Sequence, residues 1–227
     1  TSEQEWPEHW KIVEFKEYPR MPRVPLPKPA LLPLTFTEVI RRRRTRRSFN
    51  PRSTLTTDQL STLLFWSAGL NEYPHPTDAR TFRRFYASGG GRYPLEVYSY
   101  FRGNAEIPEG VYHYNVRHHS LEHLPIAEPN SWVKTLSTYP WVYDAPLIIF
   151  ITAVFDRNMR KYQARGYRFV IIEAGAMLQN FYLTAEALGF ACCGIGSPFD
   201  ADVETALELH GIDESAIIAL AVGPRPA

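Results

Sequence analysis

One segment, residues 167–189, constrains the fold more than any other part of the chain. Its sequence, YRFVIIEAGAMLQNFYLTAEALG, is typical of a helix with apolar side chains on nearly every side. A helix of that kind is buried in a core or in an interface. The small residues Ala174, Gly175 and Ala176 in its middle would let another helix approach closely. We therefore expect the other elements, or a second chain, to pack around this helix.

Two shorter helices are predicted before it, each with a recognisable N-terminal cap. Thr35 and Glu38 fit a capping box, in which the hydroxyl and the carboxylate each bond a backbone N–H of the first helix. Thr56 and Gln59 fit the same box at the start of the second helix, and Gly69 is expected to end it.

The other main elements are predicted to be strands, because β-branched, aromatic and other apolar residues dominate them. They are residues 93–101, a hairpin of 110–116 and 119–124, the unbroken apolar run 145–155, and the segments 190–196 and 216–223. Asp200 is expected to cap one last helix between the final two strands. Helices and strands mix without strict alternation, so the predicted fold class is α+β.

The 227 residues are expected to form one domain that follows an N-terminal arm. Residues 1–34 contain seven prolines, which block helices and central strands, so this stretch is predicted to be extended. Aromatic residues in the arm, including Trp6 and Trp10, favour docking on a surface. Residues 35–227 then make up the main domain.

Composition argues against several classes of protein. Lysine and arginine number 25 against 24 acidic residues, and a net charge of +1 argues against a general nucleic-acid binder. Cys192 and Cys193 are adjacent, which is poor geometry for a disulfide, so we expect a reducing, cytoplasmic location. The longest apolar run, 147–155, is too short to span a bilayer. Neither nucleic acid nor a membrane is an expected partner.

Against this neutral background, residues 41–50, RRRRTRRSFN, hold six arginines in ten positions. Three interpretations fit these residues alone. They could form a nucleic-acid or nuclear-localisation patch, a solvated helix end whose cations meet the negative end of the helix dipole, or an anion site. Arginine forks beside the hydroxyl of Thr45 suit a phosphate monoester.

The histidines do not indicate a metal site. His119 and His123 would share one face of the predicted hairpin, next to His118, but no matching cysteine or carboxylate set accompanies them. We expect structural or solvated roles for them, and no bound metal. Polar residues of the long helix, Glu173 among them, must be hydrogen-bonded if buried and are attributed to packing.

Four segments, taken in order, resemble one known family. RRTRRSF (43–49) is similar to the flavin-binding start of the nitroreductase superfamily, and ASGGGRYPLEVY (87–98) resembles a later element of that family. The helix 167–189 and the preceding KYQARGYR (161–168) resemble one branch, the SagB/McbC-type dehydrogenases that make thiazoles and oxazoles in peptides. The resemblance covers roughly residues 36–224.

The resemblance implies a nitroreductase-like fold, with a central, mostly antiparallel sheet flanked by helices. It also implies an intertwined homodimer that holds FMN at two interface sites. At the matching positions, Arg43 would hold the phosphate together with Arg44, and Thr45 would bond near the phosphate or ribityl chain. Arg47 would lie near flavin N1 and O2, where a cation stabilises the negative charge of the reduced ring. A small, concentrated anion would thus explain the arginine run.

Two glycine-containing turns complete the implied flavin site. The second subunit would lend the loop 87–91, whose glycines permit close backbone approach, although a flexible hairpin loop is the alternative. The turn 194–199 would face flavin N5. A late arginine could add a phosphate contact or belong to a solvated tail. The implied contacts are Ala87, where the family usually has proline, with Ser88, Gly89, Gly90, Gly196, Ser197 and Arg225.

Lys161 and Tyr162 are the implied catalytic residues. Conversion of an azoline to an azole removes a proton from Cα and a hydride from Cβ, so a positioned base must take the proton. A neighbouring ammonium favours the deprotonated form of a phenol. The alternative is a surface lysine beside a packing tyrosine.

The function that these features favour is FMN-dependent dehydrogenation of a peptide or carrier-bound azoline, with O2 reoxidising the flavin. Cyclase proteins could be partners. Two alternatives are an NAD(P)H-dependent nitro or quinone reductase and a docking module that holds flavin without turnover.

Overall fold

The computed structural model describes residues 15–71, 83–130, 133, 139–196, 200–209, 211 and 213–226. Seven strands form one sheet in the order β1-β4-β3-β2-β5-β7-β6, and every pair of neighbours is antiparallel. The strands are β1 (Arg23–Pro25), β2 (Leu95–Phe101), β3 (Gly110–Asn115), β4 (Ser120–Leu124), β5 (Leu147–Val154), β6 (Phe190–Ile195) and β7 (Glu214–Pro224). The predicted α+β fold with a mostly antiparallel sheet is confirmed.

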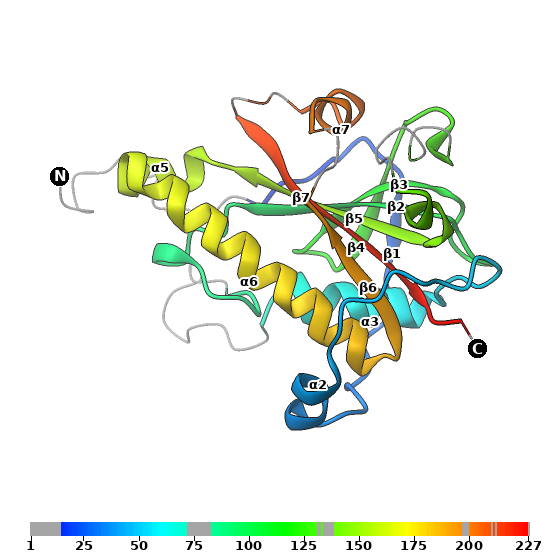
Figure 1. Ribbon diagram of the computed structural model, residues 1–227. Helices are drawn as coiled ribbons and strands as arrows, with labels where there is room; N and C mark the ends of the chain where they lie inside the picture. The colour runs from blue at the N-terminus through cyan, green and yellow to red at the C-terminus, as the bar shows by residue number, and fades with distance from the viewer. Residues whose placement is uncertain are drawn as a thin grey trace.

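Helices flank this sheet (Figure 1). Their bounds are α2 (Phe36–Arg42), α3 (Thr57–Ala68), α5 (Asp156–Tyr162), α6 (Gly166–Ala187) and α7 (Asp200–Ala206), with 3-10 turns η2 (Gly89–Gly91), η3 (Pro140–Asp144) and η4 (Gln163–Arg165). One core cluster joins Leu63 of α3 and Phe181 of α6 to one face of the sheet. A second cluster joins Val203 of α7 to the opposite face.

Local sequence signals explain where the two N-terminal helices begin. The Glu38 N–H donates to the Thr35 hydroxyl at 3.4 Å, and the Thr35 N–H donates to the Glu38 carboxylate at 2.9 Å. The corresponding distances at Thr56 and Gln59 are 3.2 and 3.0 Å. Both predicted capping boxes are confirmed.

One feature of the long helix region differs from expectation, because the seven-residue helix α5, just before α6, was not predicted. The long helix itself was expected to be buried in a core or in an interface. On this single chain the side chains of Ile171 and Ile172 are 40% and 67% exposed. Gly175 lies on the same stripe, and a Cβ placed there would meet no atom within 4 Å. An apolar, close-approach face of α6 is therefore open on this chain.

The described part of the N-terminal arm packs on the sheet. Its strand β1 pairs with β4 at the sheet edge, where Pro25 removes no hydrogen bond from a central strand. Tyr18 reaches the Tyr98 hydroxyl at 2.9 Å, and the Trp66 indole donates to the Ala30 carbonyl at 2.7 Å. Trp6 and Trp10 lie outside the described residues.

Among the described residues, no helix is both long and apolar enough to cross a membrane.

Candidate functional site

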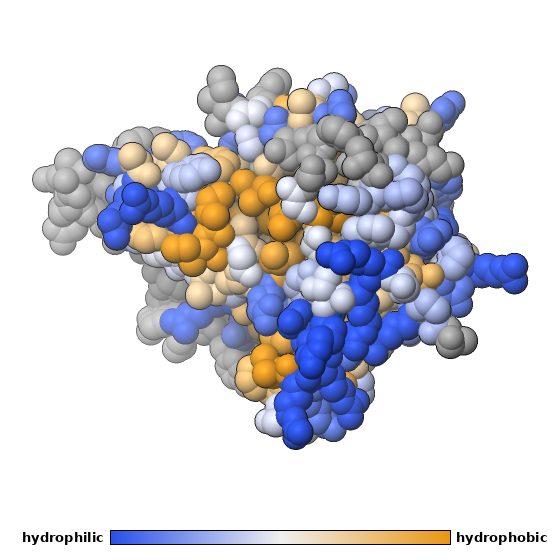
Figure 2. Space-filling model, in the orientation of Figure 1, coloured by the Kyte–Doolittle hydropathy of each residue, from blue (hydrophilic) through white to orange (hydrophobic). Residues whose placement is uncertain are grey.

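The arginine run follows α2 and covers the open edge of the sheet. Strand β6 is an edge strand, and the Arg46 N–H donates to its Cys192 carbonyl at 3.0 Å. Farther along, the Asn50 N–H donates to the Pro224 carbonyl at 2.9 Å. These backbone bonds fix the run beside β6, and Figure 2 shows its hydrophilic side chains as a strip that rises from α2.

Arg47 lines a cleft at this edge. The cleft has a volume of about 400 Å³, and its lining residues are Arg47, Tyr139, Trp141, Gly194, Ile195 and Gly196. The Arg47 guanidinium lies 5.9 Å from the Trp141 ring centroid. Burial raises the pKa of the Cys193 thiol, while its hydrogen bond with Arg47 opposes that rise. The cleft therefore combines a cation, an aromatic ring and exposed backbone at Gly196.

Arg43 lies on the α6 side of the same edge. Its guanidinium is 5.5 Å from the centroid of the Tyr182 ring, and the Tyr182 hydroxyl accepts a 2.7 Å bond from the Gly194 N–H. Tyr182 thus ties the long helix, the edge strand and the arginine run together. Thr45, between Arg43 and Arg47 in the sequence, is exposed.

The neighbouring arginines already have protein partners. Glu186 of α6 pairs with Arg46 at 2.6 Å and with Arg225 at 2.9 Å. Arg225 also donates twice to the Phe190 carbonyl, at 3.0 and 3.1 Å. Arg44 donates to the carbonyl of Arg43 at 2.8 Å. Glu186 therefore neutralises part of the run, whereas Arg43 and Arg47 lie near the aromatic rings of Tyr182 and Trp141.

The predicted loop 87–91 lies on α6, away from the β6 edge that the arginine run covers. Gly90 and Gly91 have φ values of 67° and 64°, a region that favours glycine. The Gly89 N–H donates to Glu173 at 2.8 Å, and the Ser88 hydroxyl accepts a 2.8 Å bond from the Tyr93 N–H. Ala87 is exposed and Gly90 is exposed. The loop is anchored by Glu173, and of its glycines Gly90 is exposed while Gly89 and Gly91 are half-buried.

Lys161 and Tyr162 lie against that loop. A Cβ built on Gly90 would be 2.4 Å from the Tyr162 hydroxyl and 3.3 Å from Cδ of Lys161. The Tyr162 ring meets Phe169 edge to face at 4.8 Å, and the Lys161 amine lies 5.6 Å from the Tyr162 centroid. The structure therefore brings together the predicted catalytic pair and the predicted flavin loop. Both side chains are half-buried.

Sequence reasoning missed several residues of this arrangement. Trp141, Tyr182 and Phe169 lie beside predicted site residues, but isolated aromatic residues carry no spacing signal that separates them from core residues. Glu173 was attributed to packing. In the structure its carboxylate accepts a hydrogen bond from the Gly89 N–H and so anchors the loop 87–91. The predicted contact Ser197 lies outside the described residues.

The histidines take structural positions. His119 bonds the Ser61 hydroxyl at 2.7 Å and the Tyr114 hydroxyl at 2.8 Å, and His123 stacks on Tyr112 at 4.9 Å. Within the described ranges, no group of three or more histidine, cysteine or acidic side chains is arranged to hold a metal ion.

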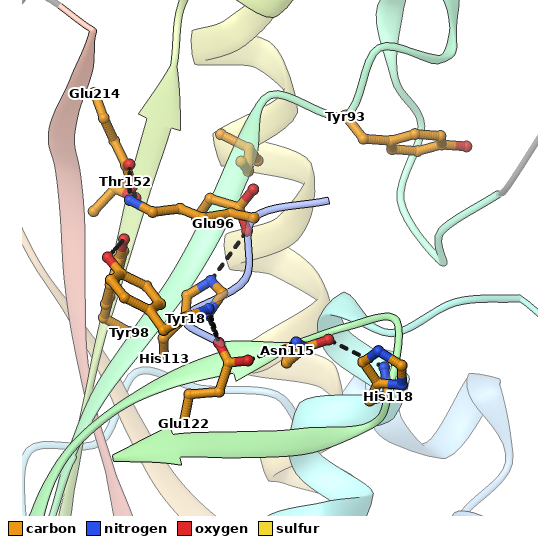
Figure 3. A network of polar contacts seen from close by, with 12 residues as sticks. Tyr18, Tyr93, Glu96, Tyr98, His113, Asn115, His118, Glu122, Thr152 and Glu214 are labelled. Atoms are coloured by element: carbon orange, nitrogen blue, oxygen red, sulfur yellow. Dashed lines mark hydrogen bonds and ion pairs between the residues drawn. The ribbon is translucent and has the colours of Figure 1, made fainter. Parts of the chain in front are cut away.

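A separate buried network surrounds His113 on the sheet (Figure 3). Its ring bonds Glu122 at 2.9 Å and Glu96 at 3.4 Å. Burial alone would raise the pKa of Glu96, but Arg157 and His113 lower it to about 2. Arg157 lies in the first turn of α5, the helix that carries Lys161. This network therefore attaches the N-terminal end of that helix to β2.

The fold and the arginine-covered sheet edge define the class of protein. The sequence profile of the nitroreductase family matches residues 40–224, and the chain belongs to this family of oxidoreductases.

Particular relatives narrow the comparison. The nitroreductase-family protein MJ1384 of Methanocaldococcus jannaschii is 31% identical over 198 residues, which are 87% of this chain and 94% of that protein. The trifolitoxin-processing protein TfxB of Rhizobium leguminosarum is 36% identical over 62% of this chain. The microcin B17-processing protein McbC of Escherichia coli is 31% identical over 53% of it. The matched regions are only 39% of TfxB and 46% of McbC.

Solved structures share the fold. A nitroreductase from Ralstonia eutropha has a TM-score of 0.74 at 24% identity, covering 90% of each chain. The E. coli microcin synthetase McbBCD complex with truncated pro-MccB17 bound contains a chain with a TM-score of 0.70 at 23% identity, covering 88% of this chain and 76% of that one. An oxidoreductase containing FMN has a TM-score of 0.56 at 13% identity, covering 86% and 79%. These matches establish the nitroreductase-like fold.

Proposed function

We propose that this chain is an FMN-dependent dehydrogenase that oxidises a peptide or carrier-bound azoline to the azole, acting in the cytoplasm. The observation that carries the proposal is the contact of Tyr162 and Lys161 with the glycine loop at Gly90. A reductase that only receives electrons from a dinucleotide has no evident use for such a pair, whereas azoline oxidation requires a base.

The residues at the sheet edge fit FMN. Arg43 and Arg47 offer guanidinium groups to a phosphate and to an electron-rich ring edge, and the cleft of about 400 Å³ beside Trp141 is lined by backbone at Gly196. A Cβ at Gly196 would meet nothing within 4 Å, so its backbone is accessible. The proposed contacts are Arg43, Arg44, Thr45, Arg47, Ala87, Ser88, Gly89, Gly90, Gly196, Ser197 and Arg225, all within a domain of residues 35–227.

Bound FMN would supply the acceptor for the hydride that leaves Cβ, and O2 would restore the oxidised cofactor. The chain's own task is to remove the Cα proton and to hold the substrate still. The Tyr162 hydroxyl would take this proton, and it lies close to the backbone of Gly90, with the ring of Phe169 and the Lys161 amine beside it.

A homodimer is part of the proposal. The open stripe of α6 includes Ile171, Ile172 and Gly175, and Phe36 of α2 is 73% exposed. Apolar side chains gather over α6 on the face drawn in Figure 2. Exposed apolar patches of this kind mark interaction sites, and a second copy of the same helix is the simplest cover.

The relatives favour a peptide substrate. TfxB and McbC are named for processing trifolitoxin and microcin B17, and the McbBCD complex is described with a truncated precursor bound. We therefore propose a peptide substrate and cyclase-like partner proteins. Because MJ1384 is matched over 94% of its length, reduction of a nitro or quinone compound by NAD(P)H is the second candidate function.

The test combines a spectrum with two pairs of variants. The purified protein should be yellow, with the two visible bands of oxidised flavin, and should oxidise a thiazoline peptide in air. Arg43→Ala with Arg47→Ala should lose bound FMN, while Lys161→Ala and Tyr162→Phe should keep FMN and lose oxidation. Arg52→Ala and Arg165→Ala remove exposed cations as matched controls and should behave like the unchanged protein.

Four results would contradict the proposal. A colourless protein that does not take up added FMN would remove the cofactor. Normal oxidation by Tyr162→Phe and by Lys161→Ala would remove the catalytic pair. Rapid bleaching by NADPH with no oxidation of azolines would favour the reductase instead, and bound FMN with no turnover of either substrate would favour a docking module.

A further inference from the structure

The polar network on the sheet reaches the proposed catalytic pair through Arg157. The Arg157 guanidinium pairs with Glu96 of β2 at 2.6 Å and donates to the Tyr93 carbonyl at 3.1 Å, while the Arg157 carbonyl accepts a 3.0 Å bond from Arg92. Lys161 follows Arg157 by four residues in α5, so the two lie one helical turn apart on the same face. These bonds fix the turn of helix that precedes Lys161.

His113 of β3 lies between this pair and a second carboxylate (Figure 3). Its Nε2 is 3.4 Å from Glu96, its Nδ1 is 2.9 Å from Glu122, and its side chain is 1% exposed. An ionised carboxylate only accepts hydrogen bonds, so both ring nitrogens must donate. Burial lowers the pKa of His113, but the bonds to Glu122 and Glu96 raise it above its usual value. The ring is therefore an imidazolium that bonds both carboxylates.

The second carboxylate is also where the N-terminal arm docks. The Glu122 oxygen that faces His113 accepts a 3.0 Å bond from the Tyr18 N–H, and its other oxygen pairs with Arg23 at 3.0 Å. The Tyr18 ring lies edge to face with the His113 ring, with 5.1 Å between the centroids. The arm therefore contacts both the imidazolium and the carboxylate that holds it.

These contacts make a continuous chain of ionic hydrogen bonds from the arm to α5. Buried ionic groups are costly to leave unpaired, so a change at one member alters the bonds of its neighbours. We infer that His113 is a positioning residue for Lys161 and Tyr162, and that docking of the arm holds α5 in place through it. The inference rests on the proposed function, because the role of the pair is taken from there.

Hydrogen exchange, followed by mass spectrometry, tests this coupling without a substrate. Arg23→Ala removes an arm contact of Glu122 and should speed exchange of the α5 amides about two- to fivefold, because a charged hydrogen bond is lost. His113→Gln removes the cation between the carboxylates and should also speed it. Added to His113→Gln, Arg23→Ala should change α5 no further. Arg20→Ala, an exposed arginine of the same arm, is the matched control, and α3 is the reference element.

Turnover gives an independent readout. His113→Gln should lower kcat for a thiazoline peptide about tenfold, because the base is less well placed. KM and bound FMN should not change, since His113 lies outside the proposed flavin contacts. Glu96→Gln cuts the chain on the α5 side and should act alike, and it replaces His113→Gln if that variant does not fold. Glu109→Gln is the control, because this carboxylate bonds Tyr100 of β2 at 2.7 Å outside the chain of bonds.

Three results would overturn the inference. In the first, exchange of α5 does not respond to Arg23→Ala, or responds equally with and without His113→Gln. In the second, α3 and α5 exchange faster together, which would mean that the network only stabilises the whole sheet. In the third, His113→Gln and Glu96→Gln keep the full kcat. Failure of the proposed function looks different, because the unchanged protein would then bind no FMN and oxidise no azoline, while the exchange of α5 could still be measured.

Discussion

At the scale of single residues, the most unusual group is the carboxyl of Glu173. It is 3% exposed, and burial raises its pKa, while hydrogen bonds from Gly89, Ser88 and Asn158 oppose that rise. A raised pKa in the folded state means that the folded chain binds more protons above pH 4.5. Stability is therefore lost as pH rises from 4.5 through the folded pKa, and the ionised carboxyl is a cost at neutral pH.

Substitution of Glu173 separates its charge from its hydrogen bonds. Glu173→Gln keeps an acceptor for Gly89, so we expect a higher melting temperature than the unchanged protein at pH 7 and no difference at pH 4. Glu173→Ala leaves the Gly89 N–H and the Asn158 amide unbonded and should cost about 1–3 kcal/mol. Calorimetry from pH 4 to 8 measures both effects. Glu106→Gln, an exposed carboxylate, is the control, and a Gln variant less stable than the unchanged protein at pH 7 would contradict the argument.

Motifs singled out the candidate site residues, but they did not predict which of these residues are in contact. Gly90, Lys161 and Tyr162 were each singled out from motifs, yet nothing in their spacing indicated that the tyrosine hydroxyl would touch the glycine. That contact depends on tertiary structure, because the fold brings the end of α5, at its turn into α6, to the loop. The same holds for Tyr182 under Arg43, because an aromatic residue on a helix is a core residue unless its neighbour in space is known.

At the scale of elements, one buried carboxylate makes several of the contacts that hold the arm. Glu122 of β4 accepts from Tyr18 N–H at 3.0 Å and pairs with Arg23 at 3.0 Å, both in the arm. From β3, His113 and Asn115 bond the same carboxylate at 2.9 and 2.7 Å. Burial would raise the pKa of Glu122, but the bonds from His113, Asn115 and Tyr18 lower it to about 2. The arm is therefore attached most firmly when this group is ionised.

Acid should weaken the attachment of the arm, and Glu122→Gln should remove this dependence of stability on pH. A carboxyl whose folded pKa lies below 4.5 contributes stability above pH 4.5 and loses it as pH falls towards 2. At about 1.4 kcal/mol per pKa unit, the loss is on the order of 3 kcal/mol. Melting temperatures between pH 2.5 and 6 should fall less steeply for Glu122→Gln than for the unchanged protein or for Glu106→Gln. Equal slopes for all three would show that Glu122 does not carry the effect.

Most elements were predictable because their signals are local. Capping boxes, apolar runs and turn glycines set the bounds of α3, β2 and β5 close to those expected. Helix α5 was missed because its sequence, DRNMRKY, is polar, and what holds it is the buried pair of Arg157 with Glu96 and the bond of Asn158 with Glu173. Such tertiary contacts are invisible in a short sequence window.

At the scale of the whole molecule, a single chain leaves two surfaces uncovered. The arginine run covers the β6 edge but leaves the Arg47 cleft open, and the stripe through Ile172 leaves apolar side chains in water. Both features are explained if the same second copy covers the stripe and completes the cleft. The nearly apolar circumference of α6 in the sequence then reflects two environments, a core on one side and an interface on the other.

Ile172→Glu tests whether these surfaces depend on each other. Ile172 is 67% exposed on the single chain, so a glutamate there costs little in a monomer, but two buried carboxylates near a twofold axis would oppose association. We expect the variant to elute and sediment as one chain of 26.1 kDa, to stay folded by circular dichroism, and to bind FMN more weakly than the unchanged protein.

Ala201→Glu adds the same charge on exposed α7, across the sheet, and should leave both mass and FMN affinity unchanged. A folded monomer with undiminished FMN affinity would mean that one chain completes the site, and an Ile172→Glu protein that remains a dimer would mean that the stripe is not the interface.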